Sequence, residues 1–151
     1  MRAKAKRILL VEDSENDIEL TLAALDQHNL ANEVIVTRDG EEALNYLFRR
    51  GPFHAREAGN PAVVLLDLKM PKTDGKEVLR QVKTDPELKA VPVVILSSSK
   101  EERDVIECYH LGVNAYVVKP VDFHEFVDAV KELGLFWSIL NVPPPRNGSA
   151  Q

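Results

Sequence analysis

Residues 63–67 read Val-Val-Leu-Leu-Asp, four apolar side chains that lead directly into a carboxylate. A short apolar run of this kind, rich in β-branched residues, is typical of a strand buried on both faces of a parallel sheet. Similar runs occur at residues 8–11, 34–36, 93–96 and 115–118. The sequence therefore predicts five strands of the same buried type.

Helical patterns alternate with these strands. Ser14 and Asp39 stand where a side chain can cap the first turn of a helix, and Asp74-Gly75 forms a predicted turn and cap for the third helix. Because crossovers between parallel strands are right-handed, the alternation predicts an α/β fold, a (βα)5 doubly wound parallel sheet with helices on both faces. The apolar positions at helical spacing are Ile18, Leu22 and Leu25; Ala43, Leu44 and Leu47; Val78, Leu79 and Val82; Val105, Ile106, Tyr109 and Leu111; and Phe123, Phe126, Val127 and Val130.

Length and composition limit the range of functions. The 151 residues fit one domain, and 44% hydrophobic residues suffice for a core of its own. The single cysteine, Cys108, excludes an internal disulfide and fits a reducing compartment, so we expect a soluble, cytoplasmic protein. No apolar run is long enough for a signal peptide or a membrane span, and the net charge of −5 argues against nucleic acid or an anionic membrane as a partner.

Polar residues follow four of the predicted strands. Glu12 and Asp13 follow the first strand, Asp67 the third, Ser97 ends the fourth, and Lys119 follows the fifth. The carboxyl ends of parallel strands meet at one edge of a sheet, so we expect these side chains to converge. Three carboxylates that lie close together need either a proton or a cation among them, and an all-oxygen site suits Mg²⁺ or Mn²⁺.

This convergence predicts a cleft for phosphoryl transfer. Asp67 is the expected nucleophile, because it follows the central strand, and its attack on phosphorus gives an aspartyl phosphate. Lys119 and the cation would neutralise charge on the phosphoryl oxygens, and the Ser97 hydroxyl would donate to one of them. Each residue alone is more simply a cap or a turn residue. Only their conjunction at four strand ends supports the functional interpretation.

Four motifs carry a family resemblance, namely Val11–Ser14, Leu65–Gly75, Val93–Ser98 and Tyr116–Pro120. In this order they resemble the receiver domain of two-component response regulators, over about residues 6–133. The resemblance implies a flavodoxin-like sheet with strand order 2-1-3-4-5. It also implies a receiver domain at residues 1–133, with its core at 6–133, followed by an extension at 134–151.

The resemblance also assigns the metal site. It implies that Asp67 is the phosphoacceptor, and that Asp13, Asp67 and the main-chain carbonyl of Lys69 bind Mg²⁺ (or Mn²⁺) directly. Glu12 is implied to act at least partly through water.

The resemblance also assigns three residues to the conformational switch that follows phosphorylation. Ser97 is implied to be the hydroxyl that turns toward the phosphoryl group, and Lys119 to be the ion-pair partner of that group. Tyr116 is implied to move inward once Ser97 has moved. The bond between Lys119 and Pro120 is expected to be cis, as in relatives.

A narrower resemblance concerns a loop and the end of the chain. The loop 49–60 and the segment 134–143 are similar to the small response regulators that serve bacterial phytochromes. This implies a light-regulated sensor histidine kinase as partner, with a downstream phosphotransfer protein as a further candidate partner. From composition alone, the segment 49–61 is more simply a tolerated surface insertion than a binding loop.

The extension at 134–151 is an apolar arm followed by a proline-rich tail, and it allows two interpretations. The arm can pack against its own domain, or it can form a homodimer interface. We favour the dimer, because the arm has more aromatic and aliphatic surface than one domain needs to cover. The interface residues would be Phe136, Trp137, Ile139 and Leu140.

The leading hypothesis is a stand-alone response regulator that switches the surface of helix four, strand five and helix five. Such a protein is a signalling switch that assists only its own phosphorylation and dephosphorylation, and not an enzyme. The alternatives are a phosphatase of the aspartyl-phosphate type and a phosphorelay intermediate that passes its phosphate to a histidine phosphotransfer protein. Lys69 argues against the phosphatase, because those enzymes need an acid two residues after the nucleophile.

Overall fold

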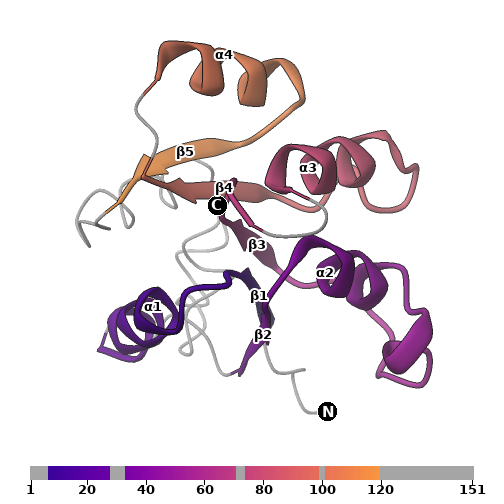
Figure 1. Cartoon of the computed structure of the whole chain (residues 1–151). Coiled ribbons are helices and arrows are strands. Elements are labelled where there is room, and N and C mark those ends of the chain that lie inside the picture. The colour runs from indigo at the N-terminus through magenta and orange to yellow at the C-terminus, as the bar shows by residue number, and fades with distance from the viewer. Residues whose placement is uncertain (1–6, 28–32, 71–73, 99–100, 120–151) are drawn as a thin grey trace, which may run out of the picture.

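The computed structural model describes residues 7–27, 33–70, 74–98 and 101–119. Its centre is a parallel sheet of five strands in the order β2-β1-β3-β4-β5, seen nearly edge-on in Figure 1. The predicted fold class and strand order are confirmed. The strands are β1 (Arg7–Val11), β2 (Glu33–Thr37), β3 (Val63–Leu66), β4 (Val93–Ser97) and β5 (Ala115–Val118).

Helices cover both faces of the sheet. Figure 1 shows α1 on one face and α2 and α3 on the other, with α4 beyond β5. A short 3-10 helix, η1, follows α2. The bounds are α1 (Glu15–Gln27), α2 (Gly40–Leu47), η1 (Gly51–Phe53), α3 (Gly75–Thr84) and α4 (Glu102–His110). None of the helices among the described residues has the length and apolar character to cross a bilayer.

The strands divide the core into two layers, because successive side chains point to opposite faces. In β1, Leu9 and Val11 belong to the layer under α2 and α3, whereas Ile8 and Leu10 belong to the layer under α1. These residues are at most 1% exposed, and β3 and β4 show the same alternation. Two-sided burial explains why β1, β3 and β4 contain continuous apolar runs. The edge strands β2 and β5 are only partly buried, so the prediction of five strands of the same buried type is wrong for these two.

The register of the sheet places the strand ends side by side. Val11 of β1 pairs with Leu66 of β3, so the residues that follow each of them lie next to one another. Asp67 N donates to Val11 O at 3.0 Å, which extends this pairing past the end of β3. At the other side, Lys119 N donates to Ser97 O at 2.8 Å. The same edge therefore receives residues from four strands.

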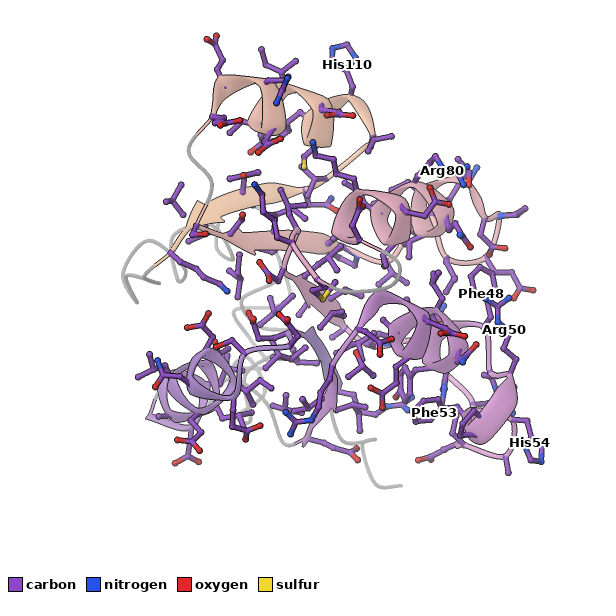
Figure 2. The ribbon with its side chains drawn as sticks, viewed as in Figure 1. Phe48, Arg50, Phe53, His54, Arg80 and His110 are labelled. Carbon is purple, nitrogen blue, oxygen red and sulfur yellow. The ribbon has the colours of Figure 1, made fainter. Side chains whose placement is uncertain are left out.

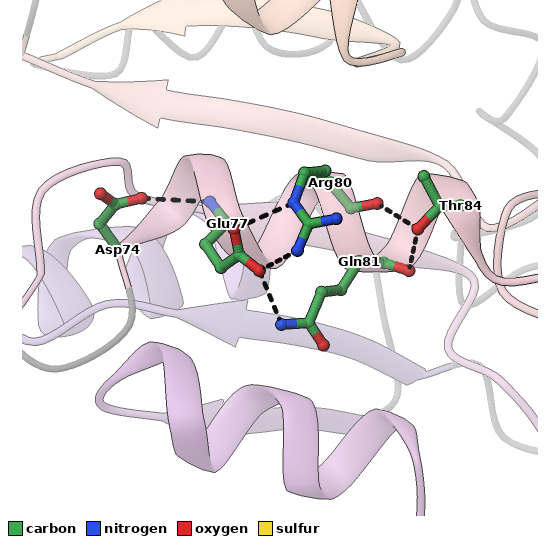
Figure 3. Close-up of polar contacts among 5 residues, drawn as sticks. All are labelled: Asp74, Glu77, Arg80, Gln81 and Thr84. Carbon is green, nitrogen blue, oxygen red and sulfur yellow. Dashed lines mark hydrogen bonds and ion pairs between the residues drawn. The ribbon is translucent and has the colours of Figure 1, made fainter.

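The predicted helix caps are confirmed. Ser14 Oγ accepts from Asp17 N at 3.3 Å, and Asp39 Oδ1 accepts from Glu42 N at 2.7 Å. Asp74 Oδ1 accepts from the main-chain nitrogen of the residue three positions later at 3.1 Å, as Figure 3 shows at the start of α3. Each cap satisfies a backbone donor in the first helical turn, and these turns start at the edge where the strands end.

The predicted apolar face of α4 is partly wrong. Ile106 and Tyr109 are 49% and 51% exposed, whereas Asp104 and Cys108 are buried. The physical reason lies in α3, where Lys76 Nζ binds Asp104 Oδ1 at 2.7 Å and makes burial of that carboxylate tolerable. Burial raises the pKa of the Cys108 thiol to about 11, so this cysteine is a packing residue.

The loop after α2 folds back onto that helix. Arg56 lies over the Tyr46 ring at 4.1 Å from its centroid, and Arg56 Nε donates to Tyr46 O at 2.7 Å. Figure 2 shows the labelled side chains of this region beyond α2, namely Phe48, Arg50, Phe53 and His54. The segment is thus an ordered addition to α2, and its interpretation as a tolerated surface insertion stays a prediction.

Several predictions concern residues outside the described part of the chain. They are the fifth helix with Phe123, Phe126, Val127 and Val130, the Lys119–Pro120 bond, and the arm with Phe136, Trp137, Ile139 and Leu140.

Candidate functional site

Three carboxylates meet at the carboxyl edge of the sheet. One oxygen each of Glu12, Asp13 and Asp67 lies within 4.8 Å of the others. Glu12 and Asp67 are 2% and 8% exposed, whereas Asp13 is exposed. The cluster thus has two buried members at the strand ends and one that opens to solvent.

The buried carboxylates are held by neighbouring backbone and side chains. Glu12 Oε2 accepts from Ser14 N at 3.2 Å, and Glu12 Oε1 accepts from Lys119 Nζ at 2.7 Å. Gly75 packs so closely that a Cβ there would lie 2.3 Å from the main-chain oxygen of Asp67. The position of Asp67 is therefore fixed by β1 on one side and by the start of α3 on the other.

Lys119 joins the cluster from β5. Its ammonium lies 2.7 Å from Glu12 Oε1, 2.8 Å from Asp17 Oδ2 and 3.7 Å from Asp67 Oδ1. The ammonium is thus shared among three carboxylates, and the partner on α1 was not among the predicted site residues. Sequence reasoning missed Asp17 because an acidic residue in the first turn of a helix is explained by the helix dipole alone.

Burial and the neighbouring charges shift the pKa of the Asp67 carboxyl. Burial and the negative charge of Glu12 raise the pKa of the Asp67 carboxyl to about 6, although Lys119 lowers it. Burial alone would lower the pKa of Lys119, but its hydrogen bonds to Asp17 and Glu12 outweigh that effect and raise it. The site therefore holds a charged lysine and more negative charge than that lysine offsets.

This excess of negative charge fits a divalent cation. Glu12, Asp13 and Asp67 lie close together with the Lys119 ammonium beside them, and burial first and the charge of Glu12 second raise the pKa of Asp67. Carboxylate oxygens are the ligands that Mg²⁺ and Mn²⁺ prefer, and the exposed Asp13 gives access from solvent. A depression of about 530 Å³ adjoins the cluster, with room for water and a phosphoryl group. Its lining residues are Asp13, Leu68, Lys69, Met70, Asp74, Lys76, Arg103 and Asp104.

The remaining predicted residues lie around this cluster. Ser97 is buried at the end of β4, where its carbonyl accepts from Lys119 N. Tyr116 is half-buried on β5 and packs against the core layer under α2 and α3. Lys69 is exposed and follows Leu68, and the role of its main-chain carbonyl as a metal ligand stays a prediction.

The sheet has the strand order of flavodoxin-like α/β folds, with acidic residues after β1 and β3 and a lysine after β5. Residues 8–131 match the response regulator receiver domain, and the chain belongs to this family.

Individual relatives are similar along nearly the whole chain. Response regulator Rcp1 of Synechocystis sp. is 40% identical over 132 residues, which are 87% of this chain and 88% of Rcp1. The structure of its Mn²⁺-bound form has a TM-score of 0.74 at 39% identity, covering 93% of this chain and 99% of that one.

Two further solved structures are similar. The bacteriophytochrome response regulator RtBRR is 58% identical with a TM-score of 0.83, covering 97% of this chain and 92% of that one. The phosphorylated cyanobacterial phytochrome response regulator RcpA is 41% identical with a TM-score of 0.76, covering 94% and 100%.

Proposed function

We propose that this protein is a response regulator that accepts a phosphoryl group from a sensor histidine kinase onto Asp67. The observation that carries the proposal is the setting of Asp67, a buried carboxylate within 4.8 Å of two others and 3.7 Å from the Lys119 ammonium. The phosphorylated structure of RcpA supports the same chemistry.

The reaction is an in-line transfer. An Asp67 oxygen attacks the phosphorus of a phosphohistidine, a P–O bond forms, the P–N bond breaks, and the imidazole leaves with a proton from solvent. Lys119 uses an N–H donor on a phosphoryl oxygen and offsets part of the charge that the group brings. The ionised form of Asp67 is the nucleophile, and in the metal-free site it prevails above pH 6 because the pKa is about 6.

Glu12, Asp13 and Asp67 would hold the divalent cation, with the Lys69 carbonyl as a further ligand. When bound, Mg²⁺ or Mn²⁺ supplies positive charge next to the transferred phosphoryl oxygens. The Mn²⁺-bound structure of Rcp1 supports this assignment.

The switch that follows phosphorylation involves Ser97 and Tyr116. We propose that the Ser97 hydroxyl turns to the phosphoryl group and that Tyr116 follows inward, so that the surface of α4 and β5 changes. The exposed apolar side chains of Ile106 and Tyr109 on α4 support a role of this surface in binding a partner or a second copy of the chain. The dimer would use Phe136, Trp137, Ile139 and Leu140 of the arm as well.

The kinase partner is proposed to be a phytochrome. Two of the similar structures, RtBRR and RcpA, are named as response regulators of bacterial and cyanobacterial phytochromes. A light-regulated histidine kinase would then supply the phosphoryl group.

Phosphotransfer from a purified, autophosphorylated phytochrome kinase tests the proposal. We expect the label to move to this protein with Mg²⁺ and to stay on the kinase with excess EDTA. Asp67→Asn should accept no label, whereas Asp26→Asn, a matched change at an exposed position of α1, should accept it like the wild type. Equal labelling of Asp67→Asn and the wild type would refute the site.

Calorimetric titration with Mg²⁺ or Mn²⁺ tests the metal ligands. Asp13→Asn removes one charged ligand, so we expect its affinity to fall by roughly tenfold or more, while Asp26→Asn binds like the wild type. Unchanged affinity in Asp13→Asn would contradict its assignment as a ligand.

A further inference from the structure

Asp17 contacts Lys119 from helix α1, whereas the other residues of the site lie at the ends of strands. It lies in the first turn of α1, and its Oδ2 is 2.8 Å from Lys119 Nζ, nearer than Asp67 Oδ1 at 3.7 Å. The Asp17 side chain is 33% exposed, so the contact lies at the rim of the site, whereas Glu12 contacts the lysine from the buried side.

The backbone of α1 holds Asp17 at this place. Its main-chain nitrogen donates to Ser14 Oγ at 3.3 Å, and Ile18 N donates to Ser14 O at 2.9 Å. Both bonds form the first helical turn, which begins directly after the end of β1. A carboxylate in the first turn is also stabilised by the helix dipole. The backbone of α1 therefore keeps the Asp17 carboxylate within reach of the lysine.

The three N–H donors of the Lys119 ammonium are divided among its neighbours. One donates to Glu12 Oε1 and one to Asp17 Oδ2, and the third is left for the side where Asp67 lies. A phosphoryl group on Asp67 needs the ammonium nearer than 3.7 Å for a charge-assisted hydrogen bond. The lysine must then move toward Asp67 and weaken its bond to Asp17.

We propose that Asp17 is a positioning residue that competes with the phosphoryl group for Lys119 and thereby limits how tightly the site holds that group. The inference rests on the proposed function of Asp67 as phosphoacceptor. Asp17 is one of three carboxylates within 4 Å of the Lys119 ammonium, and its negative charge repels an incoming phosphoryl group.

The variant Asp17→Asn tests the competition, because it removes the charge and keeps the shape. In the presence of Mg²⁺ we expect it to bind beryllofluoride, a mimic of the phosphoryl group, roughly three- to tenfold more tightly than the wild type. The matched control is Glu19→Gln, the same change of charge at an exposed position of α1, which should bind like the wild type. An affinity of Asp17→Asn equal to the control, or weaker than the wild type, overturns the proposal.

A second measurement examines the ion pair itself. In a double-mutant cycle of Asp17→Asn and Lys119→Gln, followed by urea unfolding, we expect a coupling of at least about threefold in the unfolding equilibrium. Additive effects would show that the two side chains do not interact in solution and would also overturn the proposal. If the wild type binds no beryllofluoride while the coupling is present, the proposed function of Asp67 fails and the ion pair stands.

Discussion

Asp67 combines two requirements that oppose each other. It has to be ionised to attack phosphorus, yet it is 8% exposed and lies beside Glu12, and both conditions raise the pKa of its carboxyl to about 6. Above that pH, the folded protein therefore carries a negative charge on Asp67 that burial and Glu12 make unfavourable. A divalent cation bound at the site would offset part of that charge.

This unfavourable charge predicts a pH-dependent stability. The folded pKa of about 6 exceeds the ordinary value of 3.8, so the contribution of Asp67 to stability is fully present below pH 3.8 and is lost as the pH rises through 6. In metal-free protein, Asp67→Asn should thus be more stable than the wild type at pH 7.5, by on the order of 2 kcal/mol, and nearly equal to it at pH 4. Urea unfolding in EDTA at both pH values measures the difference. A less stable variant at pH 7.5 would contradict this account.

Residues at the strand ends could be predicted from the sequence, whereas Asp17 could not. Glu12, Asp13, Asp67 and Lys119 follow buried runs, and parallel pairing brings such positions to one edge. Asp17 lies within a helix, where an acidic residue in the first turn is explained by the helix dipole alone. Its contact with Lys119 depends on how α1 packs, which no local pattern encodes.

At the scale of elements, α3 supports the site from two directions. Gly75, its first residue, leaves room for the Asp67 carbonyl, and Lys76, its second, pairs with Asp104 and Glu107 of α4 at 2.7 Å each. The same helix thus positions the acceptor and connects to the helix that carries the exposed surface. The exposed face of α4 could not be predicted, because the burial of Asp104 depends on tertiary contacts such as the one with Lys76 of α3.

The contact between α3 and α4 predicts unequal effects of two similar substitutions. Lys76→Met leaves Asp104, 7% exposed at its side chain, without its cation, and should lower the free energy of unfolding by about 2 kcal/mol. Arg80→Met breaks the exposed pair with Glu77 drawn in Figure 3 and should change stability little. Chemical denaturation of both variants measures this. Equal losses of stability in the two variants would show that the burial of Asp104 does not explain the contribution of its ion pair.

The first residue of α3 predicts an effect on chemistry. In Gly75→Ala the new Cβ would lie 2.3 Å from Asp67 O and 2.6 Å from the Cα of Leu68, so the backbone of residue 67 must shift. We expect phosphorylation by a small phosphodonor to slow by at least about tenfold, because a displaced nucleophile loses its alignment.

A control separates this displacement from lost stability. Gly112→Ala strains a residue with φ +102 near the end of α4 and should destabilise the protein without moving Asp67. Its phosphorylation rate, measured while the protein is folded, should equal that of the wild type. Equal slowing in both variants would refute the displacement of Asp67.

At the scale of the whole molecule, the fold was predictable because its central strands β1, β3 and β4 are buried on both faces. Each strand contains a short apolar run, and the turns between them carry caps that the structure contains at Ser14, Asp39 and Asp74. The described residues place the acidic cluster at one edge of the sheet, with the exposed face of α4 beside β5 (Figure 1). Short helices and strands thus connect the acidic cluster with the exposed face of α4.

The proposed dimer predicts a concentration-dependent mass. Sedimentation of the full chain at micromolar concentration should show a dimer, and a chain cut after Gly134 should be monomeric, because Phe136, Trp137, Ile139 and Leu140 are removed. Two monomers, or two dimers of equal strength, would contradict a role of the arm in the interface.

The central claim is that Asp67 carries the phosphoryl group, and chemical trapping tests it most directly. Borohydride reduces an aspartyl phosphate to homoserine, which remains at the modified position and can be located by tandem mass spectrometry. After incubation of the wild type with Mg²⁺ and acetyl phosphate, followed by borohydride, we predict homoserine at position 67, and unmodified Asp13 and Asp17. Homoserine at another aspartate, with position 67 unmodified, would contradict the account.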